Sequence, residues 1–230
     1  MEHKTQTSLV EKEPGSTGLR GMIADWLSDQ VTFRVPWSKA MMWIFLVGDA
    51  FVFGTLLSGY GAARMAAGAP WPNTGEVFAL HVGGSEIPLL LVGFMTLILL
   101  SSGGTMALAV AYGFRHDRRK AALFTALTAL LGALFVGFQG IEWTNLIQEG
   151  ARPWTNPWGV PQFGASFFTL TGFHGLHVTI GVFLLAIVAL RAARGAYDKK
   201  GDYLGVELVG LYWGFVDLVW VFLFPLFYLF

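Results

Sequence analysis

Six polar side chains stand in stretches of the sequence that are otherwise apolar, and their types and spacing could do chemistry. They are two histidines and four acids: Asp49, Glu142, His174, His177, Glu207 and Asp217. His174 and His177 are three residues apart, which places both on one face of a helix. Two histidines with a carboxylate can bind a metal ion, acids with imidazoles can relay protons, and the neutral forms can hydrogen-bond between helices.

Three interpretations of these residues therefore compete. The metal hypothesis takes His174, His177 and Asp217 as ligands, but a His-x-x-His spacing is short and predicts little alone. The proton-path hypothesis suits Asp49 and the histidines, yet no apolar stretch contains a Lys or Arg that could act as counter-ion. In the structural hypothesis, these groups hydrogen-bond between helices or to lipid headgroups. This hypothesis requires neither a metal ion nor a counter-ion and is the default.

The elements that must position these residues follow from composition. Of 230 residues, 54% are hydrophobic and 13% are charged, whereas soluble domains carry about 25% charged residues. The chain has no cysteine, which excludes disulfides, thiolate zinc sites and thiol nucleophiles. The apolar residues form five blocks long enough to cross a bilayer, at about 40–63, 87–114, 121–146, 163–190 and 204–229. We therefore predict an all-α integral membrane protein, a bundle of five transmembrane helices.

The placement of basic residues predicts the orientation of the bundle. Lys and Arg are concentrated in residues 1–39, 115–120 and 191–200, and only Arg64 and Arg152 lie in the intervening loops. Basic loops stay cytoplasmic, so we expect a cytoplasmic N-terminus and a periplasmic C-terminus. Residues 1–35 are expected to form a cytoplasmic tail, in which residues 19–30 have the apolar spacing of an interfacial helix or belong to a partly ordered tail. Residues 36–230 form the membrane domain.

Three motifs carry a resemblance to a known family. The fourth span contains ASFFTLTGFHGLHVTIG (165–181), the fifth contains ELVGLYWGFVDLVWVFLF (207–224), and the third ends in FQGIEW (138–143). Together they resemble subunit III of the haem–copper terminal oxidases, in the short five-helix bacterial form, from about Pro36 to Phe230. Asp49, within GDAFVFG (48–54), matches the family's intramembrane carboxylate, which is Glu in many members and Asp in some quinol-oxidising relatives.

The resemblance implies a role in a larger complex. Subunit III contacts subunit I, which reduces O₂ to water and pumps protons; subunit II is a further partner and a small subunit IV another candidate. Subunit III is expected to have no catalytic residue, haem, copper or other metal of its own, to bind phospholipid but no nucleic acid, and to support proton uptake in the bacterial inner membrane. The motif positions matched for lipid binding or proton uptake are Asp49, Glu142, His174, His177, Trp213 and Asp217, and Glu207 matches the family too.

Two departures from the family pattern remove histidines, because Gly214 and Ala107 stand where the family usually has that residue. Two alternatives stay open beside the oxidase subunit. One is an accessory subunit of a related nitric oxide reductase. The other is an autonomous intramembrane metalloenzyme using His174, His177 and Asp217. The electron donor, cytochrome c or quinol, is recognised by other subunits.

Overall fold

The computed structural model describes residues 35–82, 85–198 and 201–229. The chain divides into two compact units, Met1–Trp43 and Ile44–Phe230. Within the first unit only residues 35–43 are described, so the interfacial helix expected over residues 19–30 lies outside the described residues. The second unit contains all the candidate site residues.

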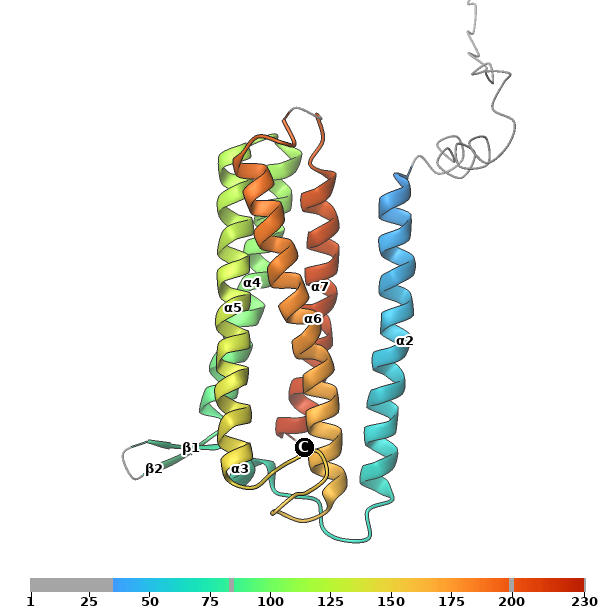
Figure 1. The fold of residues 1–230 in the computed structure, drawn as a ribbon, viewed down its shortest axis with the longest axis vertical. Coiled ribbons are helices and arrows are strands. Elements are labelled where there is room, and N and C mark those ends of the chain that lie inside the picture. Colours follow the sequence, from blue (N-terminus) through green and yellow to red (C-terminus); the bar gives the residue numbers. More distant parts are fainter. Residues whose placement is uncertain (1–34, 83–84, 199–200, 230) are drawn as a thin grey trace, which may run out of the picture. The chain divides into compact units, whose positions relative to one another are not determined.

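Five long helices dominate the described chain (Figure 1). They are α2 (Trp37–Met65), α4 (Leu90–Phe114), α5 (Arg118–Gln148), α6 (Pro161–Ala193) and α7 (Leu204–Phe224), which continues into a π-helical turn, Pro225–Leu229. A short helix α3 (Thr74–Val77) and two strands, β1 (Ala79–Val82) and β2 (Ser85–Pro88), lie between α2 and α4. All five long helices are long and apolar enough to cross a membrane. The all-α, five-helix class is confirmed, while the sides on which the termini lie remain a prediction.

The ends of the helices lie within three residues of the expected spans, and the second span shows why they differ. That span was expected to begin at Ile87, but Ile87 pairs with Leu80 in an antiparallel hairpin. Leu89 then adopts a left-handed backbone, with φ of 60°, and α4 begins at Leu90. The apolar pattern runs through residues 87–89 without a break, so hydropathy alone could not separate strand from helix.

Trp213 of α7 occupies the centre of the bundle formed by α4 to α7. Its indole N–H donates to the hydroxyl of Ser102 on α4 at 2.9 Å. A Cβ atom at Gly132 on α5 would collide with the indole ring, and one at Gly181 on α6 would lie 2.9 Å from it. Trp213 therefore packs against all three neighbouring helices, and glycines on two of them provide the space for its ring.

Further hydrogen bonds join the helices above and below this tryptophan. The indole N–H of Trp220 donates to Thr96 Oγ1 on α4 at 3.1 Å. The hydroxyls of Thr105 on α4 and Thr128 on α5 lie 2.8 Å apart. These bonds are formed by side chains, because the backbone groups of each helix already bond one another.

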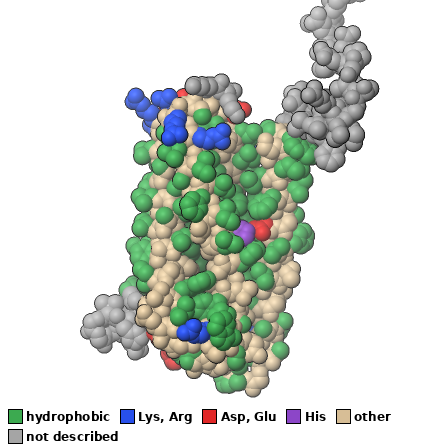
Figure 2. Space-filling model, in the orientation of Figure 1, with side chains coloured by type: hydrophobic (Ala, Val, Ile, Leu, Met, Phe, Trp, Pro, Cys, Tyr) green, Lys and Arg blue, Asp and Glu red, His purple; other side chains and the backbone are tan. Residues whose placement is uncertain are grey.

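Basic side chains lie near both ends of the bundle, most of them at one end, and hydrophobic side chains cover much of the surface between, as Figure 2 shows for one face. At that end Asp117 caps α5 by accepting from the backbone N–H of Lys120 at 3.2 Å, a bond that lowers the pKa of the Asp117 carboxyl. Tyr203, just before α7, donates to Asp198 at 2.5 Å. Burial and this carboxylate raise the pKa of the Tyr203 hydroxyl to about 12. The loops that join α4 to α5 and α6 to α7 are thus fixed by charged hydrogen bonds.

The packing around Trp213 predicts that Gly132→Ala destabilises the bundle. The added methyl must displace the indole or Val182, and such overpacking costs about 1–3 kcal/mol. Gly137→Ala is the matched control on the same helix, because a Cβ there meets nothing within 4 Å. Thermal unfolding of the two purified variants in detergent measures the difference. Equal melting temperatures would contradict the proposed role of Gly132.

Candidate functional site: buried polar groups between the helices

Asp49 on α2 and His177 on α6 form a close contact deep within the apolar part of the chain. The imidazole Nε2 lies 3.1 Å from Asp49 Oδ2, and both side chains are nearly buried. The approach is not aligned as a hydrogen bond, so the contact is primarily electrostatic. Phe53, one turn along α2, packs its ring against that of His177 with centroids 5.5 Å apart. One face of α2 therefore meets α6 through an acid, an imidazole and a phenyl ring.

The backbone fixes the tautomer of His177. Its Nδ1 lies 2.8 Å from the carbonyl oxygen of Phe173, and a carbonyl only accepts, so Nδ1 must carry a proton. The Nε2 atom then faces the carboxyl group of Asp49. The backbone of His177 is also bonded to α7, because the hydroxyl of Tyr212 donates to its carbonyl oxygen at 2.9 Å.

His174 lies on the same helix face but in different surroundings. It is only 1% exposed, and among the described residues neither ring nitrogen has a hydrogen-bond partner. Its ring stacks on Trp220 with centroids 5.4 Å apart and meets the edge of Phe135 at 6.0 Å. His174 is therefore packed as an aromatic ring against other aromatic rings. Among the described residues, no acidic side chain hydrogen-bonds to its nitrogens.

Glu142 near the end of α5 anchors the C-terminal turn. Its Oε2 accepts from the amide of Gln139 at 2.8 Å and from the hydroxyl of Tyr228 at 2.9 Å. The Glu142 residue is 5% exposed, and no described residue hydrogen-bonds to its Oε1 atom. Pro225 begins the π-helical turn that carries Tyr228, since a proline lacks the N–H that would continue the α-helical ladder. The chain end is thus tied back to α5 by a buried acid.

Asp217 lies on α7 one turn from Trp213. Its Oδ2 lies so close to Gly103 of α4 that a Cβ there would collide with it, and Oδ1 has no hydrogen-bond partner in the described part of the chain. Gly214, which replaces the family's usual histidine, is exposed and has open space beyond its backbone. Glu207 is in the first turn of α7, close to the charged end.

The candidate residues are therefore brought together in pairs and not as one cluster. Asp49 meets His177, Glu142 meets Tyr228, Trp213 meets Ser102, and Asp217 meets the backbone of Gly103. In the parts of the chain that the structure describes, no three His, Asp or Glu residues lie close enough to hold a metal ion. The ligand set proposed for a metalloenzyme, His174, His177 and Asp217, is not assembled there.

Several hydrogen-bond partners of these groups were not predicted from the sequence. Gln139 could have been predicted as a partner of Glu142, because it lies three residues earlier in the FQGIEW motif. The sequence contains no comparable pattern for Tyr212, Tyr228 and Ser102, since their partners are distant in sequence and only the packing of the helices brings them together.

The fold and these contacts define a multi-pass α-helical membrane protein whose buried polar groups join helices to one another. The sequence model of cytochrome c oxidase subunit III matches residues 29–230, and the chain belongs to that family.

Relatives of known sequence agree with this assignment. The probable quinol oxidase subunit 3 of Staphylococcus aureus (strain USA300) is 33% identical over 202 residues, covering 87% of this chain and 92% of that protein. The probable quinol oxidase subunit 3 of Staphylococcus haemolyticus (strain JCSC1435) is 31% identical over 202 residues, with the same coverage of both chains. As an oxidase subunit III, this chain takes part in a complex with other oxidase subunits.

The contact between Glu142 and Tyr228 predicts that Tyr228→Phe loosens the C-terminal turn. Loss of the hydroxyl leaves a buried carboxyl oxygen with one donor fewer, which costs about 1–3 kcal/mol. Tyr112→Phe is the control, because among the described residues the Tyr112 ring stacks on Phe124 while its hydroxyl forms no hydrogen bond. Unfolding of the purified variants in detergent, followed by circular dichroism, checks the difference. A Tyr228→Phe variant as stable as Tyr112→Phe would show that the bond contributes nothing.

Proposed function

We propose that this chain is the non-catalytic subunit III of a bacterial haem–copper terminal oxidase in the inner membrane. In this proposal it packs beside subunit I, with subunit II and a small subunit IV as further members of the complex. The haems and copper belong to the partner subunits, and this chain contributes stability, bound phospholipid and support for proton uptake. The observation that carries the proposal is that Asp49, Glu142 and Trp213 each contact a polar side chain of another helical segment. Such contacts hold helices together, as a structural and supporting subunit requires.

Binding of lipid is supported by the exposed surface of α2. Within Ile44–Met65 this helix buries a single narrow face, formed by Leu46, Asp49, Phe53 and Tyr60. Tyr60 donates to the carbonyl of Leu226 at 2.9 Å, so the two ends of that face are fixed by polar contacts. The remaining apolar surface of α2, including Phe51 at 74% exposure, is available to acyl chains.

Support for proton uptake rests on Asp49 and His177. Their side chains lie 3.1 Å apart, and neither stretch of helix contains a Lys or Arg within the apolar span. An acid and an imidazole in contact can relay protons, which suits a group placed near a proton entry path. We propose a supporting role for this pair and assign the pumped protons to subunit I.

A quinol is the electron donor that we propose for the complex. The relatives from the two Staphylococcus species carry the name probable quinol oxidase subunit 3. The Asp49 position supports the same choice, because the shorter acid resembles that of quinol-oxidising members of the family. The donor would bind to other subunits.

Purification of the intact complex tests the assignment. We expect its haem and copper to remain with the partner subunits after this chain is removed, and we expect the complex to reduce O₂ with quinol and not with reduced cytochrome c. Metal analysis of the separated subunits and O₂ uptake with each donor are the measurements. Copper or iron bound in stoichiometric amount to the isolated chain would overturn the proposal, and reduction of nitric oxide in place of O₂ would favour the reductase alternative.

The role of Asp49 is tested by Asp49→Asn. An asparagine amide can still donate to His177 Nε2, so we expect assembly and haem content to be unchanged. The variant has lost the exchangeable carboxyl proton, so proton uptake should slow. Stopped-flow measurements with a pH indicator compare it with Asp117→Asn, which changes an acid at the end of α5 and keeps its capping oxygen. Failure of Asp49→Asn to assemble would instead assign an essential structural charge to Asp49.

A further inference from the structure

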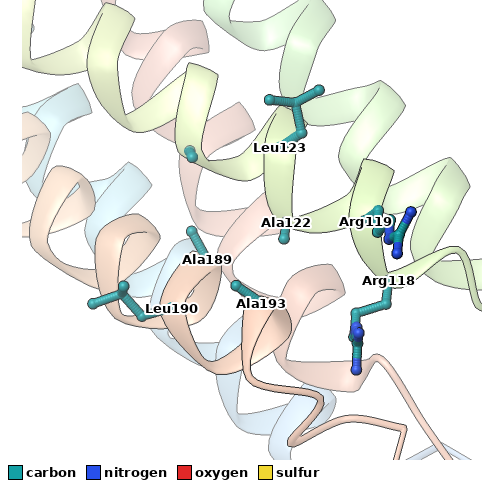
Figure 3. A pocket seen from close by; sticks show the side chains of 8 residues that line it. Arg118, Arg119, Ala122, Leu123, Ala189, Leu190 and Ala193 are labelled. Atoms are coloured by element: carbon teal, nitrogen blue, oxygen red, sulfur yellow. The ribbon is translucent and has the colours of Figure 1, made fainter.

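A groove that none of the functions above uses lies between the start of α5 and the end of α6. Its volume is about 490 Å³. Arg118 and Arg119 line one end, and Ala122, Ala126, Ala189 and Ala193 line its length (Figure 3). None of these residues belongs to the buried polar pairs. The groove thus combines an apolar slot with two guanidinium groups at its mouth.

The slot exists because of the spacing of the alanines. Ala122 and Ala126 are four residues apart on α5, and Ala189 and Ala193 are four apart on α6, so each pair follows one helix face. Leu123 and Leu190 stand beside them with exposures of 63% and 56%. The small alanine side chains leave room between the two helices, and a chain of methylene groups is much narrower than a helix about 10–12 Å across.

The mouth of the groove carries an excess of positive charge. Arg118 Nη1 lies 3.6 Å from Asp198 Oδ2, and both side chains are nearly half exposed, so this contact holds the guanidinium over the end of α6. Arg119 is exposed, and no ion pair is recorded for it among the described residues. The neighbouring acid, Asp117, is already engaged with Lys120 at 3.4 Å. Among the described residues, Asp198 is thus the carboxylate paired with this arginine couple.

We propose that this groove binds an anionic phospholipid, with its phosphate against Arg118 and Arg119 and one acyl chain along the alanine slot. Guanidinium groups suit phosphate because their planar N–H groups donate in pairs. Basic pockets between transmembrane helices select anionic headgroups on the basic side of the membrane. The site is separate from α2 and its polar contact with α6. It goes beyond the lipid contact proposed for α2, because it names a second place and a charge preference, and it requires a membrane but not oxidase activity.

Binding of two lipids to the purified, delipidated complex tests the proposal. The probes are phosphatidylglycerol and phosphatidylcholine in mixed micelles, and the readout is the lipid retained per complex by native mass spectrometry. We expect phosphatidylglycerol to bind more tightly than phosphatidylcholine. Arg119→Gln should weaken phosphatidylglycerol binding about fivefold, from the usual contribution of one basic residue near anionic lipid. Arg152→Gln, in a loop at the other end of the helices, is the control and should leave binding unchanged.

A second variant separates the slot from simple surface charge. Ala126→Leu fills the apolar slot and leaves both arginines in place, so it should also reduce retention of phosphatidylglycerol. Retention equal to the unmodified complex in Ala126→Leu, or equal retention of the two lipids, would overturn the proposal. Loss of a partner subunit from Arg119→Gln or Ala126→Leu, with lipid binding unchanged, would overturn it as well and assign the groove to a protein neighbour.

Discussion

The constraint on which this structure depends is that hydrocarbon offers no partner to a polar group. A side chain that must hydrogen-bond inside the bundle has to find its partner on another helix or on its own backbone. Trp213 and Ser102, Trp220 and Thr96, and Glu142 and Tyr228 all satisfy this requirement across helices. Each such bond also fixes the relative register of two helices, because the alternative is an unsatisfied group in an apolar medium.

The same constraint explains the importance of a few contacts on α2. Apolar packing distinguishes weakly between a neighbouring helix and lipid, since both surround a side chain with carbon. The Asp49–His177 contact and the hydrogen bond of Tyr60 to Leu226 are different, because lipid tails cannot replace them. These two contacts determine where α2 meets its neighbours along its length. An acid in this position thus contributes to how α2 packs against α6.

Features that depend on local apolar sequence could be predicted for this protein, and features that depend on the packing of distant segments could not. Hydropathy predicted the five helices to within three residues, because crossing a bilayer demands a long apolar stretch. It failed at Ile87, where strand and helix are equally apolar. The site residues could be selected as polar groups in apolar surroundings. Their partners, such as Tyr228 for Glu142, depend on the packing of helices far apart in sequence and were not predictable.

The structure shows where Gly214 and Ala107 lie, the two positions at which the sequence departs from the pattern expected from the resemblance. Gly214 and Ala107 both lie on the exposed surface of their helices, whereas Trp213 and Asp217, which flank Gly214 on α7, are buried. A histidine at position 214 would therefore point away from the bundle, toward lipid or a partner subunit, and not into the space around Asp217. Its absence leaves the internal contacts of Trp213 and Asp217 intact. The change therefore alters the surface that this chain presents to its surroundings and leaves the interior of the bundle undisturbed.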